Sequence, residues 1–131
     1  MANSKLPIGI FDSGVGGLTV LRALQNLLPA EDLLYLGDTA RLPYGTKSAE
    51  SVQRYAQHAA DSLVNRGIKL LVVACNTASA LALNQLRKHL APLPVIGVVE
   101  PGAAAAVESS RSQRYLVLAT EATTRDRKSV V

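Results

Sequence analysis

The sequence predicts an α/β fold, in which a parallel sheet is flanked by helices. Four short apolar runs, at residues 8–11, 33–36, 70–74 and 95–99, show no clean alternation with polar residues. Runs of this kind are typical of strands that are buried on both faces. Helical patterns separate the runs, and strands that alternate with helices at this spacing favour right-handed crossovers and a parallel sheet.

Each helical pattern carries its own start or stop signal. The first ends at Pro29, and its apolar face consists of Leu18, Leu21, Leu24 and Leu28. The second has Ser48 as an N-cap and Gly67 at its end, and its apolar stripe consists of Val52, Tyr55, Ala56, Ala59 and Leu63. The third, over residues 78–90, ends before the sequence APLP.

A fifth strand is predicted over residues 115–119, after the polar stretch 108–114. Twelve residues follow it, which leaves neither a crossover helix nor a later strand for pairing. The sequence therefore predicts a fold that is interrupted.

Composition restricts the class of protein. Hydrophobic residues make up 48% of the chain and charged residues 18%, as expected of a globular protein. The single cysteine excludes an internal disulfide and fits a reducing compartment. Asp12 interrupts the only apolar stretch near the N-terminus, and no run approaches the ~20 residues of a membrane span. We expect a soluble, cytoplasmic protein without a membrane partner.

The net charge of +4 does not indicate a nucleic-acid partner. The basic residues form no stripe, and one Phe and four Tyr are too few for base stacking. The charges are expected to form a solvated surface.

Polar clusters follow three of the predicted strands. They read DSGVGG at 12–17, GDTARLPYG at 37–45 and CNTAS at 75–79. In an open parallel sheet, ligands bind at the carboxyl ends of the strands. All three clusters should therefore face one cleft.

The first cluster does not have the spacing of a nucleotide-binding loop. It lacks the G-x-G-x-x-G pattern, no G-x-x-x-x-G-K-[ST] occurs in the chain, and Asp12 would repel a pyrophosphate. Asp12, Ser13 and the glycine N–H groups at a helix N-terminus suit a small anionic ligand. A tight turn alone would explain the glycines, but not Asp12 and Ser13 together.

The other two clusters leave alternatives open. Tyr44 is either a packing aromatic or a hydroxyl in the cleft. Cys75 ends a buried strand and precedes a helix, whose N-terminal dipole favours the nucleophilic thiolate, with Asn76 and Thr77 as donors or as the helix cap. The alternative is an inert buried cysteine.

No metal site is predicted. His58 and His89 lie in helical patterns away from the strand ends, and neither has metal-ligand spacing with Cys75. Both are expected at the surface.

Four blocks of the sequence together resemble the cofactor-independent aspartate/glutamate racemase family, and within it the glutamate racemases. The blocks are GIFDSGVGGLTVL, LGDTARLPYGTKS, VVACNTASA and VIGVVEPGAAAA, and the resemblance runs from about residue 8 to residue 124. It implies interconversion of L- and D-glutamate without a cofactor, which supplies D-glutamate for peptidoglycan, cell wall biogenesis and cell shape. The implied mechanism uses two thiols on opposite faces of the substrate: one removes the Cα proton and the other returns one.

The resemblance also assigns roles to residues of this chain. Cys75 is similar to the first of the two thiols, and Asp12 to the acid near it, which takes part in proton transfer and in substrate binding. The positions that resemble substrate-holding residues are Ser13, Tyr44, Gly45, Asn76, Thr77, Thr120 and Thr123.

The second cysteine of the family, with its neighbouring threonine and histidine, has no counterpart in this chain. The family has two similar α/β domains with the substrate between them, so we expect a first domain over residues 1–99 and the start of a second over 100–125. Residues 126–131 do not resemble the family and are expected to be a non-family tail. The resemblance implies an inactive N-terminal fragment of an enzyme that forms a homodimer at full length.

Two other functions remain open at this point. One is an aspartate or hydantoin-type racemase of the same family, against which the block GDTARLPYG favours glutamate. The other is a non-catalytic α/β module that binds a small anion, in which Cys75 is only part of the core.

Overall fold

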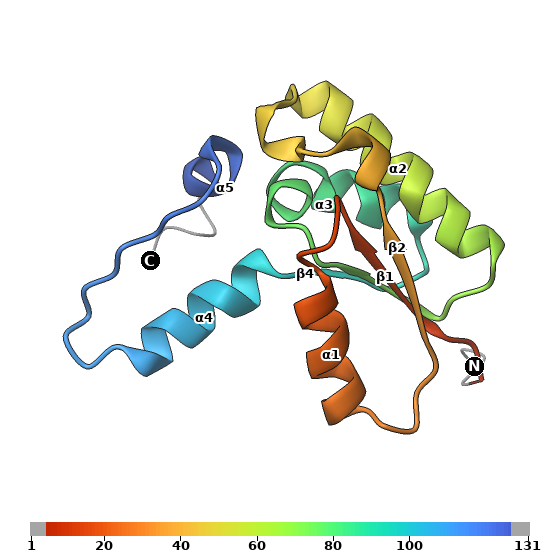
Figure 1. Cartoon of the computed structure of the whole chain (residues 1–131), viewed down its shortest axis with the longest axis horizontal. Coiled ribbons are helices and arrows are strands. Elements are labelled where there is room, and N and C mark those ends of the chain that lie inside the picture. Colours follow the sequence, from red (N-terminus) through yellow and green to blue (C-terminus); the bar gives the residue numbers. More distant parts are fainter. Residues whose placement is uncertain (1–4, 127–131) are drawn as a thin grey trace.

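The computed structural model describes residues 5–126, and its centre is a four-stranded parallel sheet (Figure 1). The strand order is β2-β1-β3-β4. The strands are β1 (Ile8–Asp12), β2 (Leu33–Gly37), β3 (Leu70–Val73) and β4 (Val95–Gly97). The predicted parallel α/β sheet flanked by helices is confirmed.

Helices follow every strand in the chain. They are α1 (Leu18–Leu27), α2 (Ala49–Asn65), α3 (Asn76–Leu90), α4 (Val99–Ser109) and the short α5 (Glu121–Arg125). Two 3-10 turns, η1 (Thr39–Arg41) and η2 (Tyr44–Thr46), lie between β2 and α2.

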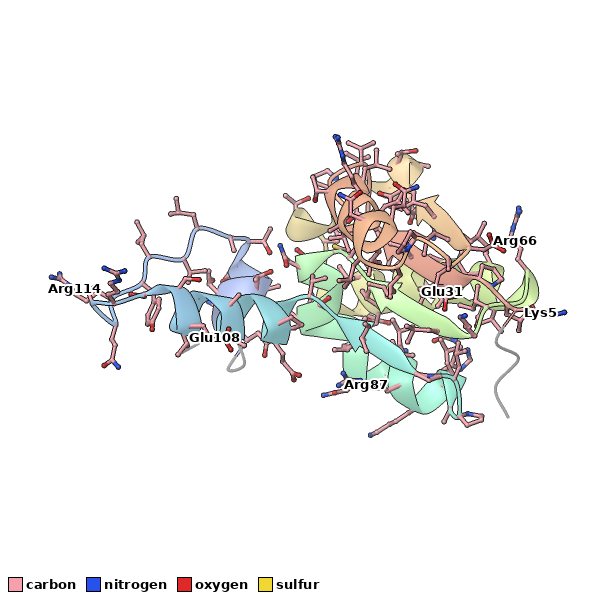
Figure 2. The ribbon with its side chains drawn as sticks, turned by 90° about the horizontal axis from the view of Figure 1, so that it is seen from below. Lys5, Glu31, Arg66, Arg87, Glu108 and Arg114 are labelled. Carbon is pink, nitrogen blue, oxygen red and sulfur yellow. The ribbon has the colours of Figure 1, made fainter. Side chains whose placement is uncertain are left out.

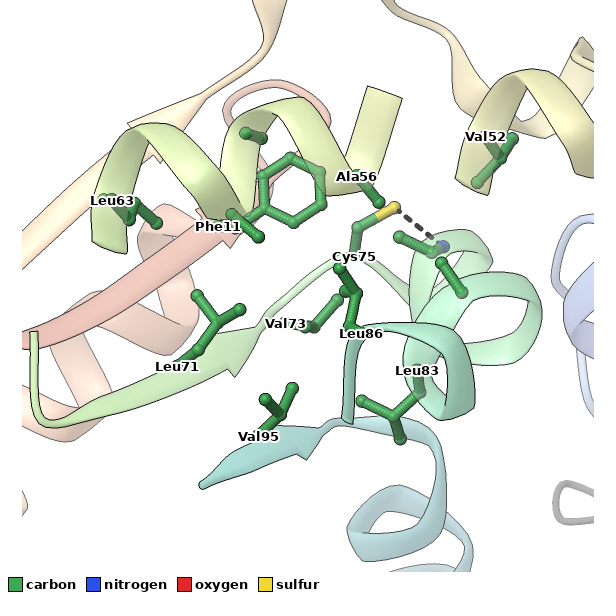
Figure 3. Packing of buried hydrophobic residues seen from close by; sticks show 14 of the residues in the cluster. Phe11, Val52, Ala56, Leu63, Leu71, Val73, Cys75, Leu83, Leu86 and Val95 are labelled. Carbon is green, nitrogen blue, oxygen red and sulfur yellow. Dashed lines mark hydrogen bonds between the residues drawn. The ribbon is translucent and has the colours of Figure 1, made fainter. Parts of the chain in front are cut away.

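The sheet is covered by helices on both faces, which explains why apolar and polar residues do not alternate along its strands. Ile10 and Val72 belong to a cluster with residues of α1 on one face. Phe11 and Val73, the next residues along the same strands, pack against α2 and α3 on the other face (Figure 3). Because successive side chains of a strand point to opposite faces, a strand with helices on both sides needs apolar residues at every position.

The strand order reverses at β1, and this reversal allows a ligand-binding site to form at the end of that strand. β1 pairs with β2 on one side and with β3 on the other. The helices that follow β1 and β3 cover opposite faces of the sheet. The loops therefore diverge at the carboxyl ends of these two strands, where open α/β sheets bind their ligands.

The predicted helix signals have the expected geometry. The Ser48 hydroxyl accepts a hydrogen bond of 3.2 Å from the Ser51 amide at the start of α2. Gly67, just beyond α2, has a φ of +78°, a left-handed conformation that glycine adopts without steric cost.

The prediction of a strand over residues 115–119 is wrong. The segment is extended and runs back beside α4 without pairing to a strand, and Leu116 and Leu118 are 86% and 87% exposed (Figure 1). A strand forms only where a neighbour accepts its hydrogen bonds, and no described segment does so here. Figure 2 shows Arg114 at the tip of this arm, away from the sheet.

Helix α4 was not predicted, because Pro101 and Gly102 disfavour a helix in the sequence. Pro101 stands in the first turn of α4, where its missing N–H removes no helical hydrogen bond. The expected domain limits at residues 99 and 125 remain predictions. The expected non-family tail lies, apart from Asp126, outside the described residues.

Candidate active site

All nine residues singled out in the sequence line one cleft of about 660 Å³ at the carboxyl edge of the sheet. The cleft is built from four parts of the chain: the loop after β1, the turn before α2, the start of α3 and the segment before α5. The nine residues are Asp12, Ser13, Tyr44, Gly45, Cys75, Asn76, Thr77, Thr120 and Thr123. The expectation that the three polar clusters share one cleft is met by this geometry.

Asp12 is the last residue of β1, and the loop that follows the strand holds its carboxylate. Its Oδ2 accepts hydrogen bonds from the amides of Gly14 (3.1 Å) and Gly17 (3.0 Å), and only 5% of the residue is exposed. The two glycine amides therefore bind a carboxylate of the chain itself, and the expectation that they serve a ligand is wrong. Gly17 is required here, because a Cβ on it would lie 2.6 Å from the Cβ of Asp12.

Tyr35, on β2, also contacts this loop and was missed in the sequence. Its hydroxyl lies 2.9 Å from the Gly14 carbonyl oxygen and 3.4 Å from Asp12 Oδ2, and donates to both. Burial, the negative charge of Asp12 and this hydrogen bond raise the pKa of Tyr35 from 10.0 to about 12. A tyrosine inside an apolar run reads as a strand residue, so only the pairing of β2 with β1 reveals the contact.

Cys75 is the N-cap residue of α3. Its Sγ accepts a hydrogen bond of 3.4 Å from the Ala78 amide, drawn in Figure 3, and the residue is 6% exposed. The cap is thus Cys75 itself and not Asn76 or Thr77, which begin the helix. The thiol packs beside the core cluster and also lines the cleft, so burial alone does not make it inert.

Asp12 and Cys75 reach the cleft from opposite faces of the sheet. Asp12 is bonded to the loop at the start of α1, whereas Cys75 belongs to the cluster that packs against α2 and α3. Among the described residues no hydrogen bond joins the two side chains. They meet only at the rim, where β1 and β3 are adjacent.

Tyr44 is a packing aromatic, the first of the two alternatives. It is 1% exposed, and its ring lies 6.1 Å from that of Phe11 and 5.8 Å from that of Tyr55. Its hydroxyl donates a 2.5 Å hydrogen bond to Asp38 Oδ2. Burial, followed by the hydrogen bond and charge of Asp38, raises the pKa of Tyr44 far above its ordinary range.

Asp38 is a second residue that the sequence did not single out. Its carboxylate also forms an ion pair of 3.0 Å with Arg41, whose guanidinium lies 4.7 Å above the ring of Tyr55. These contacts hold the turn that brings Gly45 to the cleft. The block GDTARLPYG contained the signal, since an acid and a tyrosine six residues apart flank a proline turn.

Three threonines connect the last wall of the cleft to α3. The hydroxyls of Thr77 and Thr120 are 2.9 Å apart, and those of Thr120 and Thr123 are 3.1 Å apart. Gly45 touches the same wall, because a Cβ on it would lie 2.5 Å from Cγ2 of Thr120. The segment before α5 is thereby held against both α3 and the turn before α2.

Within residues 5–126, no three His, Cys, Asp or Glu side chains are placed to hold a metal ion. His89 forms an exposed pair with Asp61, with 2.9 Å between its Nε2 and Asp61 Oδ1. None of the helices in the same part of the chain is both long and apolar enough to cross a membrane.

Comparison with known proteins connects this site to a family. The family description Asp/Glu/Hydantoin racemase matches residues 8–129, and so overlaps the segment 126–131 that was expected to differ from the family. The glutamate racemase of Geobacter metallireducens is 61% identical over 118 residues, which are 90% of this chain and 43% of that protein.

Solved structures have the same fold. Glutamate racemase from Aquifex pyrophilus matches with a TM-score of 0.90 at 48% identity, over 95% of this chain and 49% of that one. Glutamate racemase from Francisella tularensis, solved in complex with D-glutamate, matches with a TM-score of 0.84 at 38% identity, over 97% and 47% of the two chains. This chain therefore spans about half the length of these relatives.

Proposed function

The chain belongs to the Asp/Glu/Hydantoin racemase family, and we propose that it supplies one catalytic half of a glutamate racemase, a cofactor-independent isomerase. The observation that carries the proposal is the position of Cys75. Its sulfur lies at the N-terminus of α3, lines the cleft and accepts a backbone hydrogen bond. Relatives named glutamate racemase with up to 61% identity support glutamate as the substrate.

In this proposal the Cys75 thiolate removes the Cα proton of glutamate. The electron pair of the C–H bond stays on the substrate as a carbanion, and the proton passes to the sulfur. The Ala78 amide, in the first turn of α3, donates a hydrogen bond to this sulfur and so orients it. Inversion requires that a different group returns a proton to the opposite face.

The group that returns the proton is not a thiol of this chain, because Cys75 is its only cysteine. The second thiol is therefore assigned to the part of the relatives that this chain does not cover. We further propose that residues 100–125 begin the second domain, and that substrate lies between the two domains.

The walls of the cleft suggest how substrate is held. Asn76 and Thr77 bring side-chain donors to the N-terminus of α3, which suits the α-carboxylate. Asp12 suits the α-ammonium and is the proposed partner of Cys75 in proton transfer. The remaining proposed contacts are Ser13, Tyr44, Gly45, Thr120 and Thr123, with Tyr44 acting through its backbone because its hydroxyl is bound to Asp38.

The wider role follows from the proposed reaction. A glutamate racemase supplies D-glutamate for peptidoglycan, and hence for cell wall biogenesis and cell shape. We place the protein in the cytoplasm and propose a homodimer for the full-length enzyme.

Exchange of the glutamate α-proton in D₂O tests the proposal with the chain as it is. We expect slow exchange by the wild type, and none by Cys75→Ala or by Cys75→Ser, which keeps the size of the side chain but not its acidity. Fusion to the remaining half of a relative should add racemisation, which Cys75→Ala should abolish.

Other outcomes identify the alternatives. Faster exchange of aspartate or of a hydantoin than of glutamate indicates another racemase of the family. No exchange with any of the three, together with iodoacetamide labelling of Cys75 that glutamate does not change, indicates a binding module in which Cys75 is only core.

A further inference from the structure

Tyr35 and Asp12 lie on neighbouring strands at a fixed offset. In the register of the sheet, Tyr35 is opposite Ile10, and Gly37 is opposite Asp12. Tyr35 and Gly37 are two residues apart, so they present the same face, which is the face covered by α1. The tyrosine ring is long enough to extend from the level of Ile10 to the level of Asp12, where its hydroxyl contacts the loop.

The contacts around Asp12 are asymmetric. The Gly14 amide, the Gly17 amide and the Tyr35 hydroxyl all donate to Oδ2. Oδ1 takes part in none of these three hydrogen bonds. Since Asp12 is 5% exposed and lines the cleft, its second oxygen is the one left for a ligand.

Gly37 makes this arrangement sterically accessible. A Cβ at Gly37 would collide with the Gly14 carbonyl oxygen, which is the atom that accepts the shorter hydrogen bond from Tyr35. At the end of β2, the loop after β1 thus lies directly against the backbone of Gly37. The Tyr35 hydroxyl holds the loop there through its hydrogen bond to the Gly14 carbonyl oxygen.

We propose that Tyr35 is a positioning residue for Asp12, which holds Oδ2 and the loop after β1 so that Oδ1 faces the substrate. The proposal rests on the proposed function for the identity of that substrate, but the contact itself does not. Tyr35 acts through Asp12 and touches no reacting atom. Its pKa of about 12 keeps the hydroxyl protonated, and so a donor, at ordinary pH.

A double-mutant cycle on unfolding free energy tests the contact without any assay of activity. Tyr35→Phe removes only the hydroxyl, and Asp12→Asn removes the charge of its partner. We expect the double variant to lose clearly less stability than the sum of the two single losses, because Tyr35→Phe removes the same hydrogen bond that Asp12→Asn weakens. Additive losses would overturn the proposal. Tyr115→Phe, which removes a hydroxyl outside this loop, should combine additively with Asp12→Asn.

Glutamate α-proton exchange then tests the positioning role. We expect Tyr35→Phe to slow exchange at saturating glutamate by about 10-fold to 10²-fold, as the displacement of a catalytic group does. The glutamate concentration that gives half-maximal exchange should change by less than about twofold. In the Asp12→Asn background the same substitution should have no further effect, and Tyr115→Phe should match wild type. If Tyr35 had a purely structural role, Tyr35→Phe would slow exchange by the same factor in the wild-type and Asp12→Asn backgrounds. That result would overturn the proposal.

These experiments distinguish a failure of the proposed function from a failure of the positioning role. Absence of exchange in the wild type contradicts the proposed function, while the stability cycle still decides whether Tyr35 holds Asp12. Full exchange by Tyr35→Phe, with exchange present in the wild type, contradicts the positioning role alone.

Discussion

The hydroxyls of Thr77 and Thr120 lie 2.9 Å apart, although 43 residues separate them in the chain. Thr77 is buried in the first turn of α3, and Thr120 precedes α5. This hydrogen bond joins the last wall of the cleft to the helix that carries Cys75. This side-chain contact thus helps packing to hold the far wall of the site in place.

Replacing Thr120 by valine should loosen this wall. The variant keeps the shape of the side chain but loses the hydrogen bonds of its hydroxyl to Thr77 and Thr123, each with a net contribution of about 0.5–1.5 kcal/mol. We expect faster amide hydrogen exchange in residues 115–125 with little change in the sheet. Thr124→Val, on the exposed side of α5, is the matched control. Equal exchange rates in the two variants would show that the hydroxyl contacts of Thr120 do not hold the wall.

Two adjacent glycines should respond differently to alanine. At Gly17 a Cβ would meet Asp12 at 2.6 Å and 2.9 Å, whereas at Gly16 nothing lies within 4 Å. Gly17→Ala should therefore lower the unfolding free energy by about 1–3 kcal/mol, the usual cost of overpacking, and displace the Asp12 carboxylate. Gly16→Ala should leave stability nearly unchanged. Urea unfolding of both variants measures the difference, and equal losses would contradict the geometry of the loop.

Stability should fall at high pH because of Tyr35. Its pKa is 10.0 when unfolded and about 12 when folded, so the folded state holds the proton more tightly. The resulting contribution is fully present below pH 10.0 and is lost as the pH rises through about 12. Tyr44 acts in the same direction. Urea unfolding as a function of pH should show a shallower fall for Tyr35→Phe than for Tyr115→Phe, a control outside the loop. Parallel curves would contradict the assignment.

Leu116 and Leu118 should make the chain prone to self-association. They are 86% and 87% exposed on an extended, unpaired segment, which is the kind of surface that recruits another chain. Replacing both by lysine should reduce association, as measured by sedimentation and light scattering. Leu27→Lys, at a position 75% exposed on α1, is the control for added charge. A loss of folded protein in the double variant would instead show that the segment is integral to the fold.

The sequence alone was sufficient for the four strands of the sheet, for the three helices between them and for the meeting of the three polar clusters. Strand and helix patterns are local, and the carboxyl ends of parallel strands share one edge. Cys75 at the junction of β3 and α3 follows from the same patterns. So does the cap at Ser48, because a cap acts within a single helical turn.

The role of each polar atom follows from the packing of distant segments and could not be read from the sequence. The Asp12 carboxylate accepts hydrogen bonds from the loop amides, and the Tyr44 hydroxyl donates to Asp38. The Tyr35 hydroxyl contacts the loop after β1 from a neighbouring strand. Residues 115–119 remain unpaired although their composition suits a strand. Each of these outcomes depends on which distant segment lies alongside and in which register. The pattern of a segment determines its secondary structure, but the partners of its side chains are determined by the packing of the whole chain.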